Sequence, residues 1–380
     1  MKYRKLGNTG LSVSEVGFGG EHIDNTPYEN VEKVLSTALD HGVNIIDVFM
    51  SGPQIRSDMG KALGEKRKDV ILQGHVGAVW QNGQYGRSRN VAECDLFIKD
   101  FLTRFQTDYI DLGMIHFVDS EEDYRDAFET DYIEYVQKLK KDGTIRFIGA
   151  SSHNADTAIK MINTGLVEML MFSINPAFDM LPAGTVIDDL FNDATYKEHR
   201  FAIDPKRAEL YRLCEEKGIG ITVMKSLGAG RLLNEATSPF GVGLTPTQCI
   251  HYALDRPSVA SVLMGARTQE QMLESLHYSE ATLEERDYTV IANGRQSAMQ
   301  GKCMYCNHCL PCPSNIDIAS VTKYLDMARE TGATGTLRAH YDALSAHAGD
   351  CIECGSCENN CPFHVKIIEN MQEAVRVFGR

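Results

Sequence analysis

The feature that most constrains the fold of this chain is a regular alternation of short apolar segments with longer amphipathic ones over roughly its first 280 residues. The short segments are rich in β-branched side chains and do not alternate cleanly, as expected for strands buried on both faces. They are Val16–Gly20, Val43–Val48, Val70–Gly74, Tyr109–His116, Ile145–Ala150, Met169–Ile174, Ile219–Met224 and Val259–Met264. The amphipathic segments include Tyr28–His41, Val91–Phe105, Asp131–Lys141, Pro205–Lys217 and Thr245–Leu254. A strand followed by a helix, repeated in this way, predicts an α/β fold that closes into a parallel (β/α)8 barrel, the TIM barrel.

A doubly wound open sheet is the alternative for such an alternation, but it usually carries a G-x-G-x-x-G turn after its first strand. The sequence GFGGEHID at this place does not supply that turn. Tyr3–Leu6 and Leu11–Ser14 flank the turn sequence GNTG and predict a hairpin at the bottom of the barrel. Two long insertions, Gly77–Ser88 and Pro176–Asp204, follow the third and sixth strands. Both leave from the carboxyl ends of strands, where barrels of this kind build their active sites.

The end of the chain is rich in cysteine. Two closely spaced motifs, C-x2-C-x2-C-x2-C-P from Cys303 and C-x2-C-x2-C-x3-C-P from Cys351, contain eight of the 11 cysteines. Thiolates three residues apart suit three corners of an iron–sulfur cubane. A pair of zinc sites, each with four cysteine ligands, is the alternative, although zinc ribbons do not need cysteines this dense. Cys94, Cys214 and Cys249 fall within helical stripes and are expected to be core thiols.

The two cysteine motifs resemble those of bacterial two-cluster ferredoxins, except that the first is one residue shorter before its fourth cysteine. The resemblance implies two 4Fe–4S clusters with crossed ligation, in which the fourth cysteine of each motif binds the cluster of the other. One cluster would be bound by Cys303, Cys306, Cys309 and Cys361, and the other by Cys351, Cys354, Cys357 and Cys312. Helical patterns at Ala319–Arg329 and Arg338–Ala346 indicate that this ferredoxin-type iron–sulfur domain is mainly helical. We therefore expect a barrel over 1–280, a helical linker over 281–300 and the iron–sulfur domain over 301–380.

Composition narrows the partners and the location that we expect. The formal net charge of −14 disfavours phosphate backbones and anionic lipid heads, so we expect neither a nucleic acid nor a membrane as a partner. The beginning of the chain, MKYRKLGNTG, does not look like a signal peptide, and no run of eighteen apolar residues occurs. A cytoplasmic location is therefore expected. Thiols stay reduced there, which favours metal ligation by the cysteines over disulfides.

Six segments of the predicted barrel, taken in order, resemble the aldo-keto reductase family. They are YRKLGNTGLSVSEVGFGG, GVNIIDV, TDYIDLGMIH, IRFIGASSHN, VMKSLGAGRL and VLMGARTQEQM. The resemblance implies an oxidoreductase with a catalytic tetrad of Asp, Tyr, Lys and His, in which the tyrosine donates a proton to a carbonyl. Asp47 and His116 match two members of this tetrad. Gly52 stands at the place of the tyrosine and His75 at the place of the lysine, so two members are absent.

His75 is our candidate for the missing proton donor, because imidazole titrates near neutrality and Asp47 would hold its other nitrogen. The predicted catalytic residues are therefore Asp47, His75 and His116. Neighbouring strand ends also carry Glu21, His22 and His153. A metal site made of two histidines and one carboxylate is an alternative use of these side chains.

The resemblance also implies a nicotinamide cofactor. We expect NADP(H), because an arginine at the adenosine end of the site could pair bidentately with its ribose phosphate. Its carboxamide would bind Ser151, and its pyrophosphate would lie against a loop formed by Lys225, Ser226, Leu227, Gly228 and Gly230. Its adenosine phosphate and adenine would bind Arg267 and Gln271. The alternative is an inherited barrel that no longer binds nicotinamide.

The expected function is that of an iron–sulfur oxidoreductase. It would act on a small organic substrate at the barrel mouth, and the clusters would relay electrons, with a possible electron-transfer protein as a partner. Two alternatives remain open from the sequence. One is a lyase or reductive dehydratase that uses the histidines of the mouth, and the other is a non-enzymatic electron-transfer protein.

Overall fold

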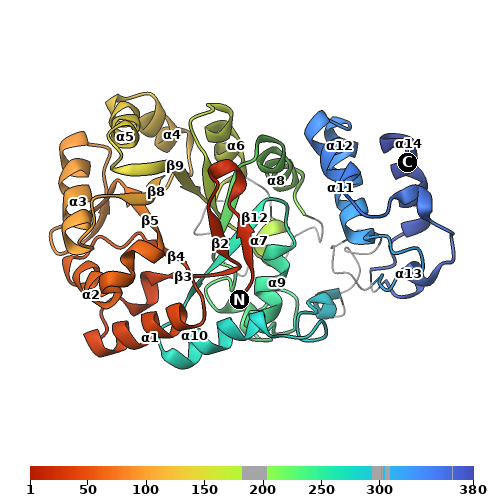
Figure 1. Cartoon of the computed structure of the whole chain (residues 1–380), viewed down its shortest axis with the longest axis horizontal. Coiled ribbons are helices and arrows are strands. Elements are labelled where there is room, and N and C mark those ends of the chain that lie inside the picture. The colour runs from red at the N-terminus through yellow and green to blue at the C-terminus, as the bar shows by residue number, and fades with distance from the viewer. Residues whose placement is uncertain (182–202, 293–300, 302, 304–308, 362) are drawn as a thin grey trace.

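The computed structural model of the chain describes residues 1–181, 203–292, 301, 303, 309–361 and 363–380. Eight parallel strands close into a barrel in the order β10-β11-β12-β3-β4-β5-β8-β9 (Figure 1). The strands are β3 (Val16–Gly19), β4 (Ile45–Val48), β5 (Ile71–Val76), β8 (Ile110–Ile115), β9 (Ile145–Ser152), β10 (Met169–Ser173), β11 (Gly220–Met224) and β12 (Val259–Gly265). The predicted barrel and its eight strands are thereby confirmed, and strand ends differ from the prediction by at most two residues.

Helices follow the strands and surround the barrel (Figure 1). They are α1 (Tyr28–Asp40), α2 (Pro53–Leu63), α3 (Val91–Arg104), α4 (Glu121–Phe128), α5 (Asp131–Lys141), α6 (Ala155–Asn163), α7 (Pro176–Asp179), α8 (Pro205–Lys217), α9 (Pro246–Leu254) and α10 (Gln269–Leu276). In α1 the apolar stripe of Val31, Val34 and Leu35 is buried, as its spacing predicts. The start of α9 is fixed by a capping box, in which Thr245 accepts from the backbone of Gln248 and the Gln248 side chain accepts from the backbone of Thr245.

Two hairpins stand at opposite ends of the barrel. The first consists of β1 (Tyr3–Lys5) and β2 (Ser12–Ser14), and it buries Leu6 and Val13 in the apolar interior at the amino ends of the strands. This hairpin was predicted. The second consists of β6 (Ala78–Gln81) and β7 (Gln84–Arg87) and forms the insertion after β5. Its turn residues Asn82 and Gly83 both have positive φ, as a tight two-residue hairpin turn requires.

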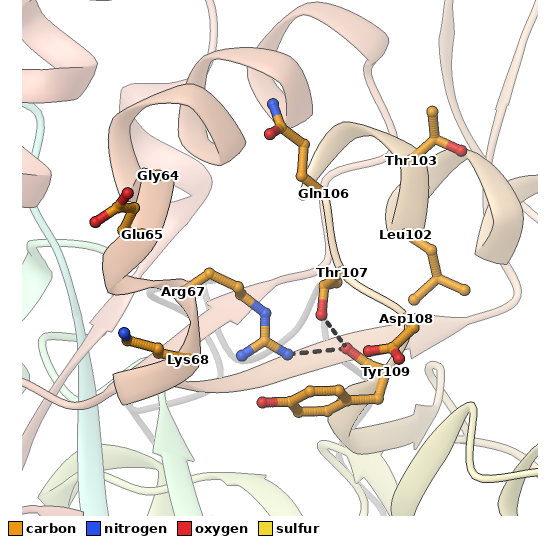
Figure 2. A pocket seen from close by; sticks show the side chains of 10 residues that line it. All are labelled: Gly64, Glu65, Arg67, Lys68, Leu102, Thr103, Gln106, Thr107, Asp108 and Tyr109. Atoms are coloured by element: carbon orange, nitrogen blue, oxygen red, sulfur yellow. Dashed lines mark hydrogen bonds between the residues drawn. The ribbon is translucent and has the colours of Figure 1, made fainter.

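A cleft of about 650 Å³ lies at the amino end of β5 and β8, away from the carboxyl ends of the strands. It is lined by the 3-10 helix η3 (Gly64–Asp69), by the end of α3 and by the residues between α3 and β8. Figure 2 shows Arg67 and Thr107 both directed at the carbonyl of Tyr109. The second terminal nitrogen of Arg67 donates to the carbonyl of Val70. These bonds tie the cleft walls together at the closed end of the barrel.

The C-terminal helices form a lobe beside the barrel (Figure 1). They are α11 (Ile318–Thr331), α12 (Gly335–Asp342), α13 (Ser356–Asn359) and α14 (Ile367–Phe378), which confirms a mainly helical domain. The lobe contacts α8, where His340 Nδ1 lies 2.8 Å from the Glu215 carboxylate and Thr334 donates to Glu216.

The predicted linker helix is not found in the part of 281–300 that the structure describes. Residues 281–292 contain turns and the 3-10 helix η8 (Thr289–Ala292), and the remaining residues of the predicted linker lie outside the described ranges. Thr282 and Glu285 exchange the two hydrogen bonds of a capping box, but only a single turn follows them. Throughout the described ranges, every helix is too short or too polar to span a bilayer.

Candidate functional site

Asp47, His75 and His116 meet at the carboxyl ends of three neighbouring strands, β4, β5 and β8. His75 Nε2 lies 2.8 Å from Asp47 Oδ1, and His75 Nδ1 lies 2.8 Å from His116 Nδ1. All three are buried, with at most 5% of each residue exposed. The structure thus brings together the three residues that the sequence singled out as catalytic candidates.

Asp47 is held from below by Gln73, which lies two residues before His75 on β5. Gln73 Nε2 donates to Asp47 Oδ1 at 2.7 Å, and Gln73 Oε1 accepts from Thr222 on β11 at 3.0 Å. Residues two apart on a strand face the same side, so Gln73 and His75 both point into the barrel. The sequence signal for this contact is a glutamine two residues before a histidine at the end of the same strand.

The hydrogen bonds continue to a residue outside the predicted catalytic set. Tyr85 on β7 places its hydroxyl 2.5 Å from His116 Nε2. The Phe49 ring stacks on His116 at 6.0 Å and meets Tyr85 edge-on at 5.7 Å, and so covers this bond. The side chains of Asp47, His75, His116 and Tyr85 therefore form one continuous chain, which we call the hydrogen-bond chain. The only sequence signal for Tyr85 is that it lies in the insertion after the third strand, which leaves from the carboxyl end of the barrel.

Burial and neighbouring positive charge set the protonation of this chain. Burial lowers the pKa of His116 well below 6.5, and the adjacent His75, Arg89 and Arg87 lower it further, so His116 is neutral. Burial raises the pKa of Tyr85, whereas Arg87 and Arg89 act in the opposite direction. Tyr85 is therefore a phenol at neutral pH, and its proton lies where positive charge favours release.

The hairpin β6–β7 also occupies the region in which the family's tyrosine would stand. A Cβ atom at Gly52 would lie 3.5 Å from the Trp80 ring, and Trp80 pairs with Tyr85 across the hairpin. Ser51 donates to the carbonyl of Val79 at 2.5 Å, which ties the hairpin to the loop after β4. A tyrosine at position 52 would compete with Trp80 for this space.

The other polar side chains of the mouth lie outside the hydrogen-bond chain. His153 Nδ1 bonds to Asp119 at 2.9 Å, and the pKa of Asp119 is lowered below its usual value although burial opposes this, because His153 hydrogen-bonds to it. His22 lies against Gly265 on β12. The described ranges contain no group of three or more His, Cys, Asp or Glu side chains placed to hold one metal ion. The facing nitrogens of His75 and His116 bond to each other, in contrast to the suggested two-histidine, one-carboxylate metal site.

The predicted cofactor residues lie at the ends of β9, β11 and β12. Ser151 accepts from the backbone of Phe117, and Lys225 lies 3.6 Å from Glu21 across the mouth. Leu227 is half-buried, and Ser226 is buried with its hydroxyl 3.4 Å from the Met264 sulfur. Gly228 and Gly230 have positive φ in the turn after β11. Exposed Arg267 and Gln271 adjoin at the start of α10, where Gln271 Oε1 accepts from the Arg267 backbone. Because β11 and β12 are neighbours, the turn after β11 and the pair Arg267 and Gln271 lie at one edge of the mouth, whereas Ser151 lies on β9, beyond β10.

A cavity in the C-terminal lobe combines cysteines from both motifs. It is lined by Cys312 of the first motif together with Cys351, Cys354 and Cys357 of the second. The other lining side chains are mostly apolar and include Ile316, Ile318, Ile352, Ile367 and Met371. A cubane takes one thiolate on each of its four iron atoms, so this set supplies the number of ligands that one cluster needs. The combination matches the crossed ligand set.

The remaining four predicted ligands are only partly described. Cys309 and Cys361 are buried, and Cys303 is half-buried. The backbone of Gly301 donates to the carbonyl of Phe363 at 2.6 Å, which brings the first motif next to the segment that follows Cys361. Cys306 lies outside the described residues. Cys94, Cys214 and Cys249 are buried within the barrel, as predicted.

The barrel with its chain of acid–base side chains and the cysteine-lined lobe together define a (β/α)8-barrel oxidoreductase with an iron–sulfur domain. Comparison with protein families agrees with this class. The model of the aldo/keto reductase family matches residues 15–248, and that of the 4Fe–4S dicluster domain matches residues 302–366. The first match covers more than half of the chain, which therefore belongs to the aldo/keto reductase family and is an oxidoreductase.

Several known proteins are similar to this chain. An uncharacterized oxidoreductase of Bacillus subtilis (strain 168), YqkF, is 26% identical over 295 residues, which are 74% of this chain and 92% of that protein. L-Galactose dehydrogenase of Arabidopsis thaliana is 26% identical over 324 residues, covering 75% of this chain and 93% of its own. Among solved structures, the holo form of aldo-keto reductase AKR11C1 from Bacillus halodurans has a TM-score of 0.60 at 24% identity. The match covers 78% of this chain and 97% of the reductase, and it shows that the two share a fold.

Proposed function

We propose that the protein reduces or oxidises a small organic substrate at the barrel mouth with NADP(H), and that Asp47, His75 and His116 manage the proton that accompanies hydride transfer. The observation that carries the proposal is the buried bonding of His75 to both Asp47 and His116. Both ring nitrogens of His75 are engaged and the residue is 4% exposed. His75 therefore exchanges protons through its two bonded neighbours, Asp47 and His116.

NADP(H) is the cofactor that the edge of the mouth favours. Arg267 is exposed and presents a guanidinium suited to bidentate binding of a ribose phosphate, next to Gln271, which would contact the adenine. The turn of Gly228 and Gly230 allows close approach of a pyrophosphate, with Lys225 supplying charge. Ser151 would contact the carboxamide. The nicotinamide, when bound, supplies a hydride.

The iron–sulfur domain is proposed to bind two 4Fe–4S clusters with crossed ligands. Cys312, Cys351, Cys354 and Cys357 would bind one, and Cys303, Cys306, Cys309 and Cys361 the other. Such clusters supply one-electron transfer. An exchange of electrons with a separate electron-transfer protein, in the cytoplasm, completes the proposal. Nucleic acids and membranes are not among the proposed partners of this acidic chain.

Nicotinamide binding is the decisive experiment for the barrel. Titration of the anaerobically purified holoprotein should show tighter binding of NADP(H) than of NAD(H), because Arg267 recognises the added phosphate dianion. Arg267→Ala should erase the preference. Arg376→Ala, which removes an exposed arginine on α14, serves as the matched control and should leave it unchanged. Equal affinity for both nucleotides, or no binding, contradicts the cofactor proposal.

Metal analysis and two serine variants test the clusters. Two cubanes correspond to about eight iron and eight sulfide per chain. Cys312→Ser should impair the cluster of the second motif, and Cys361→Ser that of the first, as resolved by electron paramagnetic resonance of the reduced protein. Zinc without iron would exclude clusters, whereas damage confined to each variant's own motif would exclude crossed ligation.

A further inference from the structure

We propose that Tyr85, on the hairpin β6–β7, is the group that hands the proton to the substrate, and that this proton is drawn from His75 through His116. The inference rests on the proposed function and deepens it, because it assigns the catalytic proton donor of the same site. It also assigns His75 a different task from that of a direct donor.

Exposure decides which member of the hydrogen-bond chain can touch a substrate. Tyr85 is 41% exposed, whereas Asp47, His75 and His116 are each at most 5% exposed. His116 uses Nδ1 for His75 and Nε2 for Tyr85, so neither of its ring nitrogens is available to a ligand. A proton that leaves this chain toward the mouth therefore leaves through the Tyr85 hydroxyl.

The chain has two self-consistent arrangements of protons, because each of its bonds holds one. In the first arrangement both histidines are neutral and all donors point inward. Tyr85 donates to His116 Nε2, His116 Nδ1 donates to His75 Nδ1, and His75 Nε2 donates to the Asp47 carboxylate. With one added proton, His75 is an imidazolium that donates to the Asp47 carboxylate and to His116 Nδ1. His116 Nε2 then donates to the Tyr85 oxygen, and the Tyr85 O–H is free to donate to a substrate.

Proton delivery converts the second arrangement into the first. When a substrate carbonyl carbon accepts a hydride from NADPH, which leaves as NADP+, the π-electron pair of the carbonyl moves onto its oxygen. The Tyr85 O–H bond breaks, and its proton forms the O–H bond of the alcohol. The phenol oxygen takes the proton of His116 Nε2, His116 Nδ1 takes that of His75 Nδ1, and His75 becomes neutral. Solvent returns one proton before the next turnover, and alcohol oxidation runs the same sequence backwards.

The hairpin explains why the family's own tyrosine position has no side chain here. Trp80 adjoins Gly52, and its cross-strand partner Tyr85 reaches the mouth from the other strand of the hairpin. The guanidinium of Arg87, two residues along the same strand, lies 3.9 Å from the Phe117 ring beside His116. This cation supports release of the Tyr85 proton, as the absent lysine does in the family's tetrad.

Ring-nitrogen NMR of histidine-labelled holoprotein tests the connection without turnover. Above about pH 6.5 the wild-type protein should show His116 protonated at Nδ1, with Nε2 accepting a hydrogen bond. Tyr85→Phe should shift the Nε2 resonance of His116 toward that of an unbonded nitrogen and leave that of His75 Nε2 in place. Tyr3→Phe, which removes an exposed hydroxyl at the far end of the barrel, is the matched control and should change neither. An unmoved His116 resonance in Tyr85→Phe overturns the proposal.

Turnover tests the chemistry, with methylglyoxal, glyceraldehyde and L-galactose as probes and NADP(H) as cofactor. Tyr85→Phe should lower kcat by about 10²–10⁴ while NADP(H) binding and iron content stay at wild-type values. Full kcat in Tyr85→Phe together with an inactive His75→Ala would overturn the role of Tyr85 and leave the proposed function intact. Loss of NADP(H) binding in the wild-type protein, with no probe turned over, would overturn both.

Discussion

The two hairpins of this barrel close its two ends with opposite chemistry. The β1–β2 hairpin places Leu6 and Val13, both fully buried, among Leu112, Met114 and other apolar side chains inside the amino end of the barrel. The β6–β7 hairpin instead brings a phenol to a buried imidazole at the carboxyl end. The first hairpin is fixed mainly by apolar packing, whereas the second adds several polar bonds to the burial of Ala78 and Val79.

The difference teaches where substitutions should affect stability and where they should affect chemistry. Apolar burial contributes free energy in proportion to the area removed from water, so the amino-end hairpin should contribute mainly to folding. The carboxyl-end hairpin is anchored at its base by buried Ala78 and Val79 and by bonds such as Ser51 to Val79, and its tip is exposed. Such an element can reposition a functional group at little cost to the fold. The cleft in Figure 2 also lies at the amino end. Arg67 binds backbone carbonyls there, so this side chain too should contribute mainly to folding.

The largest expected effect falls on the chemistry of the carboxyl end. His75→Ala removes the proton store of the chain and should lower kcat by about 10²–10⁴, while leaving NADP(H) binding and iron content intact. His277→Ala, which removes a surface histidine paired with Glu285, is the control and should keep wild-type turnover. Steady-state kinetics on the probes named above is the measurement. Wild-type kcat in His75→Ala would show that the proton follows a route without His75.

The second expected effect falls on the stability of the amino end. Leu6→Ala should reduce the free energy of unfolding by about 2–5 kcal/mol, because it deletes a buried side chain from a packed layer. Leu283→Ala, at a side chain that is 81% exposed, should change it by less than about 0.5 kcal/mol. Urea denaturation of the holoprotein measures both. The comparison of the two ends fails if Leu6→Ala lowers kcat in the folded protein as strongly as Tyr85→Phe does.

Sequence patterns predicted the elements whose identity depends on local burial. Eight β-branched runs were identified as strands because strands buried on both faces are continuously apolar, and the GNTG turn marked the first hairpin. The same strand ends placed Asp47, His75 and His116 together, because parallel strands present their carboxyl ends at one rim. The sequence did not predict Tyr85, which meets His116 across 31 residues through the arrangement of an insertion. Contacts of this kind depend on how a loop packs, which neither residue periodicity nor spacing specifies.

The third prediction concerns the pH dependence of stability, which should arise from His116 at the carboxyl end and not from the apolar amino end. Burial depresses the pKa of folded His116 below 6.5, whereas the unfolded residue titrates near 6.5. Below about pH 6.5 the unfolded chain therefore binds a proton that folded His116 does not, so stability should fall there by up to about 1.4 kcal/mol per pH unit from this group. Above that pH the group should contribute no slope. His116→Asn should reduce the slope measured by denaturation, whereas Leu6→Ala should lower stability by an equal amount at each pH.

The smallest expected effect is a titration shift at the tip of the β6–β7 hairpin. Arg87 lowers the pKa of Tyr85 against the raising effect of burial, so Arg87→Gln should raise the pKa of this phenol. Arg125→Gln, on α4 and paired with Glu121, provides a control of the same charge change away from the mouth. Ultraviolet titration of tyrosinate, taken as the difference between each protein and its Tyr85→Phe counterpart, isolates the one phenol. An unchanged titration in Arg87→Gln would mean that solvent screens this cation from Tyr85, and that the hairpin contributes its tyrosine without tuning it. A shift would show that the carboxyl-end hairpin carries both the proton donor and the charge that eases proton release, in contrast to the apolar hairpin at the other end.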